Sequence, residues 1–279
     1  MSSVPATLLV HGGAGNPSPE RLGDEAHYHR ALRAALDAGA AAIADGALDA
    51  VIAAVQVLED APEFNAGRGS VLNRDGIVEM DASVMDGRSG AAGGVAAVHR
   101  VRHPVALAQA VMERSPHLLL AAAGAERFAE EQGLELMDPA WFVVDHRPED
   151  DAAGTVGAVA LDASGGLAAA TSTGGRSGQL PGRVGDSPVI GAGTWADERR
   201  AISMTGHGEA VLGHLSAYVI ATSAAPLSDA CANAIAARGP SAAGKIAIDA
   251  EGGIALPFNT RIMHRGWWRA GDEPQTRVA

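Results

Sequence analysis

Two threonines in the middle of the chain have the residue types and the spacing for hydrolytic chemistry. Thr155 follows Gly154 and stands directly before the apolar run 156–161, and Thr173 closes the TST triplet that ends the next apolar run. A threonine hydroxyl is a weak nucleophile and needs a base near neutral pH. The α-amine of an N-terminal threonine is such a base, because its ordinary pKa is roughly 7.7 to 8.0. We therefore hypothesise that the chain cuts itself between Gly154 and Thr155. The ordinary alternative for Thr155 is a β-branched residue that begins a strand.

A second chemical group lies in the glycine- and proline-rich sequence LPGRVGDSP, where Arg183 and Asp186 are three residues apart. A guanidinium can bind a carboxylate through two parallel hydrogen bonds, and a carboxylate can accept from an α-ammonium group. The pair would therefore recognise the two charged groups of an amino acid. From spacing alone, a surface ion pair on a loop is the better interpretation.

The threonines require a sheet that holds them. Residues 156–161 and 167–171 flank the turn sequence DASGG, which predicts a β-hairpin. The first run is almost continuously apolar, and this is typical of a strand that is covered on both faces. Residues 138–154 have no periodicity and contain prolines and acidic residues, so we expect a polar connection that leads to the cleavage site.

The rest of the chain predicts strands alternating with pairs of helices, and therefore sheet packed on sheet with helices outside. Apolar residues at helical spacing predict helices at 28–43 and 48–58, two between 103 and 132, and others at 208–223 and 227–237. Within the pair between 103 and 132, the proline of Ser115-Pro116-His117 is expected to begin the second helix. Strands are predicted at 6–11, 78–84, 93–98, around 202–204, and in a closing hairpin of 246–250 and 254–258.

Composition limits the classes of function. The chain has 279 residues, of which 47% are apolar and 19% charged, as expected for a soluble globular protein. Its net charge of −12 argues against a nucleic-acid partner and an anionic membrane surface. The single cysteine, Cys231, cannot form an internal disulfide and is expected to be a buried apolar residue. No signal peptide is predicted and no run approaches the roughly 20 apolar residues of a membrane span, so we expect a cytoplasmic protein.

Several ordered motifs resemble one family. The sequences TVGAVALD from Thr155, TSTGG from Thr171, LPGRVGDSP from Leu180, GAGTWAD from Gly191 and TGHGE from Thr205 are similar to the plant-type asparaginase and isoaspartyl aminopeptidase family. LLVHGGAG, EFNAGRGSVL, EMDASVMDG and LPFNT match the same family in the same order, so the resemblance covers nearly the whole chain. It implies one N-terminal nucleophile (Ntn) hydrolase domain over residues 1–279, with a four-layer αββα sandwich. It also implies cleavage into an α subunit, 1–154, and a β subunit, 155–279, that assemble as a dimer of αβ heterodimers.

The resemblance also assigns roles to individual residues. Thr155 would be the nucleophile with its own amine as base, Thr173 would orient it, and Thr205 with the Gly206 amide would form the oxyanion hole. A strand end followed by a turn is the ordinary alternative for Thr205 and Gly206, and a turn residue is the alternative for Asn65. The residues implied in substrate binding are Arg183, Val184, Gly185, Asp186, His207, Gly208 and Asn65.

No cofactor is implied for the catalytic step, but the resemblance implies a sodium ion that steadies the site. Hard cations take oxygen ligands, and here the ligands would be backbone carbonyls. The implied donors are the carbonyls of Leu58, Glu59, Ala61, Phe64, Ala66 and Arg68. The implied reaction is hydrolysis of L-asparagine, of β-aspartyl (isoaspartyl) dipeptides, or of both, through an acyl-enzyme. A glycosylasparaginase-like activity is the alternative within the same class.

Two residues depart from the family pattern. His207 places a bulky titratable side chain inside TGHGE, and Arg176 follows Gly175 where the family commonly has an apolar residue. Both are expected to face the substrate, and they leave the preference between asparagine and β-aspartyl peptides open. For a lone histidine, a structural role is the usual alternative.

Three further classes remain as competing interpretations. GAGTWA from Gly191 matches the dinucleotide-binding pattern G-x-G-x-x-A, but the polar stretch after it is too short for the helix that this pattern requires. His27 and His29 suggest a metal hydrolase, but no H-E-x-x-H motif and no pair of cysteines supports this interpretation. A non-catalytic acidic scaffold that binds small ligands would keep Arg183 and Asp186 and dispense with Thr155.

Overall fold

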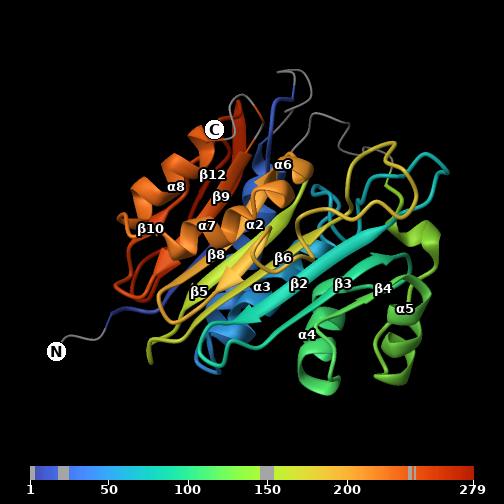
Figure 1. Cartoon of the computed structure of the whole chain (residues 1–279), viewed down its shortest axis with the longest axis horizontal. Coiled ribbons are helices and arrows are strands. Elements are labelled where there is room, and N and C mark those ends of the chain that lie inside the picture. Colours follow the sequence, from blue (N-terminus) through green and yellow to red (C-terminus); the bar gives the residue numbers. More distant parts are fainter. Residues whose placement is uncertain (1–3, 18–24, 145–153, 238–240, 242) are drawn as a thin grey trace.

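Two β-sheets packed face to face form the centre of the molecule, and a layer of helices covers the outer face of each (Figure 1). This computed structural model describes residues 4–17, 25–144, 154–237, 241 and 243–279. The four layers are those of an αββα sandwich, which confirms the fold expected from the sequence. Three buried apolar clusters fill the spaces between successive layers.

The large sheet has the order β12-β11-β1-β5-β6-β2-β3-β4, and all neighbours are antiparallel except the parallel pair β3 and β4. The predicted hairpin is confirmed as β5 and β6, which lie at the centre of this sheet and are buried along their whole length. The strands are β1 (Thr7–Gly15), β2 (Met80–Asp86), β3 (Ala92–Val98), β4 (Leu119–Ala121), β5 (Val156–Leu161), β6 (Leu167–Thr173), β11 (Ile262–Arg269) and β12 (Gln275–Arg277).

The small sheet has the order β10-β9-β8-β7 and is antiparallel throughout. Its strands are β7 (Thr194–Ala196), β8 (Arg200–Gly206), β9 (Ala243–Asp249) and β10 (Ile254–Ala255). Along β8, Ile202 and Met204 face the helices while Ala201 faces the large sheet, as the two-residue period of a strand requires. Ser203 and Thr205 therefore point into the space between the sheets.

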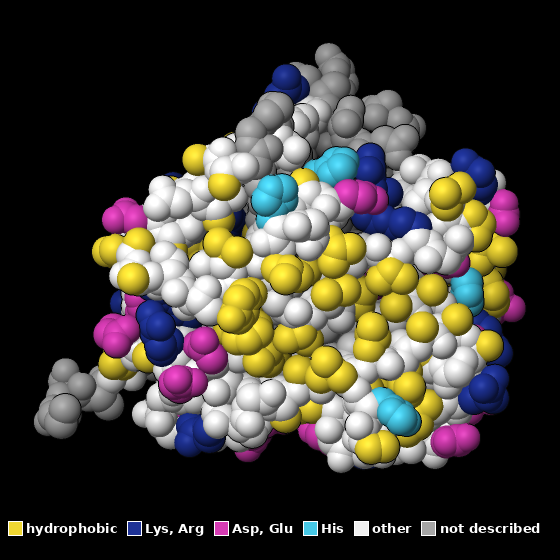
Figure 2. Space-filling view, viewed as in Figure 1, with side chains coloured by type: hydrophobic (Ala, Val, Ile, Leu, Met, Phe, Trp, Pro, Cys, Tyr) yellow, Lys and Arg dark blue, Asp and Glu magenta, His cyan; other side chains and the backbone are white. Residues whose placement is uncertain are grey.

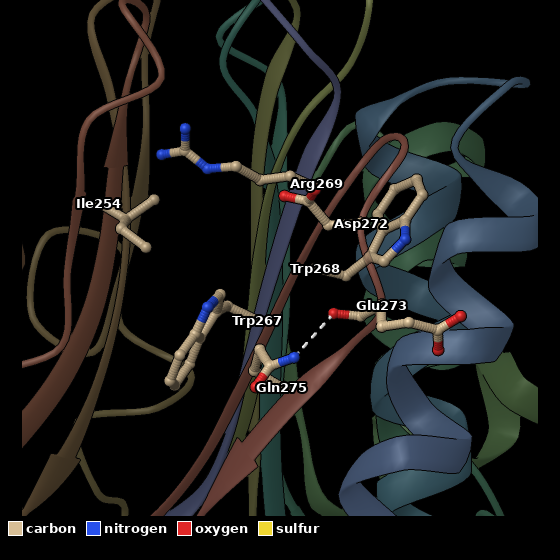
Figure 3. Close-up of a pocket in the computed structure, with 7 residues that line it drawn as sticks. All are labelled: Ile254, Trp267, Trp268, Arg269, Asp272, Glu273 and Gln275. Atoms are coloured by element: carbon tan, nitrogen blue, oxygen red, sulfur yellow. Dashed lines mark hydrogen bonds between the residues drawn. The ribbon is translucent and has the colours of Figure 1, made fainter.

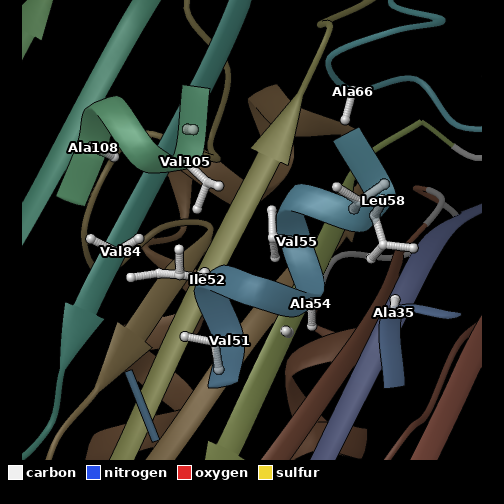
Figure 4. Packing of buried hydrophobic residues seen from close by; sticks show 14 of the residues in the cluster. Ala35, Val51, Ile52, Ala54, Val55, Leu58, Ala66, Val84, Val105 and Ala108 are labelled. Carbon is white, nitrogen blue, oxygen red and sulfur yellow. The ribbon is translucent and has the colours of Figure 1, made fainter. Parts of the chain in front are cut away.

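Helices α2 (Ala26–Ala42), α3 (Ala47–Asp60), α4 (Pro104–Arg114) and α5 (Ala122–Glu131) cover the large sheet, and α6 (Gly208–Gly213), α7 (Ser216–Thr222) and α8 (Leu227–Ala236) cover the small one. The predicted apolar face of α3 is confirmed by buried Val51, Ile52, Val55 and Leu58. Figure 4 shows Val51, Ile52 and Val55 among the side chains that fill this layer. A 3-10 turn covers Pro139–Phe142, and residues 145–153 of the predicted connection lie outside the described residues.

Two helix predictions need correction. The helix expected over 208–223 is two helices, because Leu215 takes a left-handed conformation (φ 46°) between α6 and α7. Pro116 does not begin a helix, since residues 119–121 form β4 and α5 starts at Ala122. There the backbone pairs with the edge of β3, and this tertiary pairing outweighs the local proline signal.

The end of the chain also differs from the expectation. The hairpin of β9 and β10 exists, but the chain then returns to the large sheet as β11 and β12. The sequence IMHRGWWR of β11 mixes charged residues and glycine with apolar ones, so it shows no clean strand pattern. Pairing with β1 over most of its length makes it a strand.

Burial and helix character agree with two further expectations from composition. Cys231 lies inside the cluster between the small sheet and its helices, which confirms its structural interpretation. Within the described ranges, every helix is too short or too polar to cross a membrane.

Candidate active site

Thr155 stands one residue before β5 at the centre of the large sheet, and only 8% of it is exposed. Its hydroxyl donates a hydrogen bond to Thr173 Oγ1 at 3.3 Å, so the structure brings together the predicted nucleophile and its orienting group. Antiparallel pairing of Val156 with Ser172 fixes this contact, because it sets the two threonines opposite each other.

Asn65 fixes the segment that follows Thr173. The backbone N–H of Gly175 donates to Thr173 Oγ1 at 3.1 Å, and Asn65 Nδ2 donates to the Gly175 carbonyl at 2.8 Å. Gly174 allows this approach, because a Cβ there would lie 2.3 Å from Asn65 Oδ1. The structure thus places Asn65 beside the predicted catalytic threonines, where it holds backbone.

Thr205 lies at the same end of the sandwich as Thr155. It pairs with Gly244 of β9, and Ala14 Cβ is 2.8 Å from the place where a Cβ on Gly244 would lie. Ala14 follows the part of β1 that pairs with β5, at the end where Thr155 begins. The buried hydroxyl of Thr205 has no hydrogen-bond partner among the described residues, so its proton is available to a bound group. The next residue, Gly206, has φ 125°, a conformation that favours glycine.

Arg183 and Asp186 meet at the first residue of α6. A Cβ on Gly208 would lie 2.6 Å from Arg183 Nη2 and 2.9 Å from Asp186 Oδ1, so both side chains approach the bare glycine backbone. Only 15% of the Arg183 side chain is exposed, and Asp186 is buried. The predicted pair is therefore assembled against Gly208, and we call these three residues the clamp.

Glu209 holds the arginine of the clamp, and the sequence analysis did not identify it. Arg183 Nε donates to Glu209 Oε1 at 3.1 Å. Partial burial acts to raise the pKa of Glu209, but the hydrogen bond from Arg183 and the nearby positive charges lower this pKa to about 2. The carboxylate is therefore ionised at neutral pH. The sequence signal was an acidic residue in the first turn after TGHG, which is also the usual sign of a helix start.

The loop between Arg183 and Asp186 is tied to the large sheet through Asp81, a second residue that the sequence analysis did not identify. Asp81 accepts hydrogen bonds from the backbone N–H groups of Gly185, at 3.0 Å, and Ala97, at 2.9 Å. Burial raises the pKa of Asp81 to about 6, although these hydrogen bonds act to lower it. Gly185 thus anchors the loop by its backbone, while 37% of the neighbouring Val184 is exposed.

The two departures from the family pattern lie together at the rim of the site. Arg176 Nη1 is 3.3 Å from His207 Nε2 and donates to Glu209 Oε2 at 3.4 Å. His207 Nδ1 is 3.7 Å from the same carboxylate oxygen. Figure 2 shows arginine or lysine, histidine and acidic side chains gathered near α6 on this face. The rim is therefore the charged and exposed part of the site.

A buried carboxylate supports β6 from the helix side. Glu59, near the end of α3, accepts hydrogen bonds from Ser172 Oγ at 2.6 Å and from the backbone N–H of Val105 at 3.0 Å. Its other oxygen is 3.2 Å from His103 Nδ1. Burial raises the pKa of Glu59 despite these partners. Because Ser172 precedes Thr173, this carboxylate helps to fix the strand that carries the orienting threonine.

The loop of the implied sodium site turns back on itself. The Arg68 N–H donates to the Glu59 carbonyl at 2.7 Å, and a Cβ on Gly67 would lie 2.3 Å from that oxygen. Likewise, a Cβ on Gly69 would lie 2.6 Å from the Phe64 carbonyl oxygen. Each carbonyl has two lone pairs, so one hydrogen bond leaves it able to bind a hard cation. The chemistry of this donor set is compatible with a sodium ion.

The residues behind the dinucleotide-binding and metal-hydrolase interpretations have ordinary structural places in the fold. After Gly191 the chain forms β7 and then β8, with no helix, so the dinucleotide-binding interpretation is wrong. His29 Nδ1 is hydrogen-bonded to Thr276 at 2.7 Å, and His27 packs against Tyr28. In the part of the chain that the structure describes, no three His, Cys, Asp or Glu side chains converge as a metal site would require.

A cavity of about 460 Å³ lies elsewhere in the molecule, at the hairpin of β11 and β12 (Figure 3). Trp267, which lines it, pairs with Leu9 of β1, and Leu9 pairs with Val159 near the far end of β5. The cavity is therefore at the opposite end of β5 from Thr155. It is lined by Ile254, Trp267, Trp268, Arg269, Asp272, Glu273 and Gln275, none of which is a predicted site residue.

Comparison with known proteins finds similarity to one family of hydrolases. The family model described as "Asparaginase" matches residues 4–150 and 144–278. An isoaspartyl peptidase of Salmonella typhimurium is 44% identical over 307 residues, covering 98% of this chain and 98% of the relative. A plant-type L-asparaginase of Pyrobaculum calidifontis is 43% identical over 293 residues, covering 95% and 98%. An isoaspartyl peptidase/L-asparaginase of Rattus norvegicus is 46% identical over 240 residues, covering 75% and 71%.

Proposed function

The chain belongs to the asparaginase family of hydrolases, and we propose that it is a self-processing amidohydrolase for L-asparagine, β-aspartyl dipeptides, or both. One observation supports this most directly. The buried contact of Thr155 with Thr173 lies at the same end of the sandwich as the unpartnered hydroxyl of Thr205. A nucleophile, a group that orients it and an oxyanion donor are the parts that acyl transfer needs.

The first proposed reaction is self-cleavage. Thr155 Oγ1 attacks the carbonyl carbon of Gly154, the C–N bond breaks, and the acyl group moves from nitrogen to oxygen. Water then hydrolyses the ester, which leaves a carboxylate on Gly154 and a free amine on Thr155. The products are an α subunit of residues 1–154 and a β subunit of residues 155–279. Cleavage thus creates the base that the nucleophile requires.

The second proposed reaction is substrate hydrolysis by the processed form. The neutral amine of Thr155 takes the hydroxyl proton as Oγ1 attacks the side-chain amide carbon, and returns that proton to the leaving nitrogen. The Thr205 hydroxyl and the Gly206 amide stabilise the oxyanion, for which one donor contributes about 2.7 to 4 kcal/mol. Water then attacks the aspartyl ester and releases aspartate.

Substrate selection is assigned to the clamp. Arg183 binds the α-carboxylate and Asp186 the α-ammonium of the aspartyl group, with Gly208 leaving room for both. Val184, Gly185, His207 and Asn65 complete the lining of the site. A small-molecule substrate is compatible with the acidic net charge of −12, which argues against a polyanionic partner.

We also propose that a sodium ion steadies the site and that the processed chains form an oligomer. The carbonyls of Leu58, Glu59, Ala61, Phe64, Ala66 and Arg68 would hold the ion, which would stiffen the loop that carries Asn65. It takes no part in the bond-making steps, and no cofactor is required for them. The proposed assembly is a dimer of αβ heterodimers.

Denaturing gel electrophoresis with N-terminal sequencing tests the proposal. We expect two fragments, with Thr155 at the new N-terminus, and release of ammonia from asparagine or of the leaving amino acid from β-aspartyl dipeptides. Activity restricted to glycosylated asparagine would instead indicate the glycosylasparaginase-like alternative. A chain that stays whole after long incubation and hydrolyses none of these amides would contradict the proposal.

A further inference from the structure

We propose that Arg176 binds the free carboxylate of the leaving amino acid in a β-aspartyl dipeptide. The site would then recognise two carboxylates on a dipeptide, one by Arg183 and one by Arg176, but only one on asparagine. This inference rests on the proposed function and adds to it a residue that determines the substrate class. It follows from where the two guanidinium groups lie relative to the nucleophile and to each other.

Arg176 is connected to the nucleophile by a short path. Its neighbour Gly175 donates its N–H to Thr173 Oγ1 at 3.1 Å, and Thr173 Oγ1 accepts from Thr155 at 3.3 Å. The backbone of Arg176 therefore begins at the edge of the catalytic threonines. A leaving group that departs from Thr155 passes close to this segment.

Glu209 sets the distance between the two arginines. Its Oε1 accepts from Arg183 Nε at 3.1 Å and its Oε2 accepts from Arg176 Nη1 at 3.4 Å. Gln179 adds a second link, because its Oε1 accepts from the Arg176 backbone N–H at 2.8 Å and from Arg183 Nη1 at 3.4 Å. Hydrogen bonds to the two oxygens of one carboxylate keep the donor nitrogens of the two arginines close together.

This arrangement leaves the Arg176 guanidinium only partly paired. Arg183 lies beside two carboxylates, Glu209 and Asp186, whereas Arg176 shares Glu209 with it. About half of the Arg176 side chain is exposed (52%). Of its three guanidinium nitrogens, only Nη1 contacts another side chain among the described residues. The exposed N–H groups can donate hydrogen bonds to a second anionic partner.

The substrate carries one carboxylate for each of the two arginines. A β-aspartyl dipeptide has its α-carboxylate on one side of the scissile amide and the carboxylate of the leaving residue on the other. With the first on Arg183 and the scissile carbonyl at Thr155, the second extends toward the rim. Asparagine loses ammonia and offers nothing to Arg176, so the second arginine favours dipeptides through a charge-assisted hydrogen bond.

A comparison of two leaving groups tests the inference. The kcat/KM for β-aspartyl-leucine is divided by that for β-aspartyl-leucine amide, which lacks the terminal charge. We expect Arg176→Gln to lower this ratio by about 3- to 10-fold, as for a half-exposed charged hydrogen bond. Arg176→Lys keeps the charge and should give an intermediate ratio. Any disturbance of Arg183 through Glu209 cancels in the ratio, because both substrates carry the same aspartyl group.

Arg114→Gln is the matched control, since it removes an exposed arginine from α4 on the opposite helix layer. It should keep the wild-type ratio. An unchanged ratio in Arg176→Gln, with both dipeptides cleaved, would overturn the role of Arg176 and leave the proposed function standing. If the processed wild-type protein cleaved neither the dipeptides nor asparagine, the proposed function would fail and this inference with it.

Discussion

The proposed catalytic threonines and the clamp are held by opposite kinds of structure. Thr155 and Thr173 are buried, uncharged, and fixed by the register of two central strands. In the clamp, Arg183 lies on a loop and is held by Glu209 at a helix start. The two side chains form an ion pair close to solvent. A register error of one residue would turn the threonines to the other face, whereas the clamp can shift by side-chain rotation.

This difference separates reaction from recognition. Changes at the threonines should remove chemistry altogether, and changes at the clamp should alter affinity by graded amounts.

Removal of the nucleophile should have the largest effect. In Thr155→Ala no hydroxyl remains to attack Gly154 or substrate, so we expect an uncut, folded chain with activity reduced by about 10⁴-fold or more. Gel electrophoresis and ammonia release measure the two losses. Cleavage that persisted in this variant would show that another residue is the nucleophile.

Loss of the clamp arginine should leave the chemistry in place. Arg183→Ala should still process itself, because the clamp lies outside the contact of Thr155 with Thr173. Its KM should rise about 30-fold or more. The variant loses a charged hydrogen bond to the substrate carboxylate, and the carboxylate of Asp186 remains next to that group. Steady-state kinetics on asparagine measure this, and an unchanged KM would contradict the role in carboxylate binding.

The sequence could predict the part of the site that backbone pattern determines. The hairpin of β5 and β6 follows from two apolar runs and a glycine-rich turn, and the opposition of Thr155 and Thr173 follows from its register. The layers follow from the alternation of strands and helix pairs. The resemblance supplied the roles of Arg183 and Asp186, and the structure brings them together at Gly208.

The rest depends on contacts between distant segments. Asp81 anchors Gly185 across 104 positions of sequence, and Glu59 reaches Ser172 across 113, which no local pattern reveals. β11 becomes a strand by pairing with β1 and β12. Glu209 was hidden for another reason, because an acidic residue in a first helical turn has an ordinary explanation until Arg183 is seen beside it.

A single methyl group should disturb the clamp by a smaller amount. Gly208→Ala places a Cβ 2.6 Å from Arg183 Nη2, so the guanidinium must move. We expect KM to rise roughly 3- to 10-fold, as displaced binding groups lose alignment with the substrate, and self-cleavage to proceed normally. Gly213→Ala at the other end of α6 is the control, because a Cβ there meets no atom within 4 Å. Equal kinetics in the two variants would argue against a clamp assembled at Gly208.

The ion pair between Arg183 of the clamp and Glu209 should have the smallest effect, a contribution to stability that depends on pH. The pKa of Glu209 is lowered to about 2 from an ordinary 4.5, so its stabilisation is present above about pH 4.5 and is lost as the pH falls toward 2. Glu209→Gln removes the charge and should lower the free energy of unfolding at pH 6 by no more than about 1 kcal/mol, because the side chain is half exposed. The difference from the parent should shrink between pH 4.5 and pH 3.

Urea unfolding in a Thr155→Ala background, where the chain stays whole, measures this difference in the free energy of unfolding. Glu251→Gln, in the exposed turn after β9, is the control. A difference that stayed constant over this pH range would mean that Glu209 acts on stability through packing and not through its charge on Arg183.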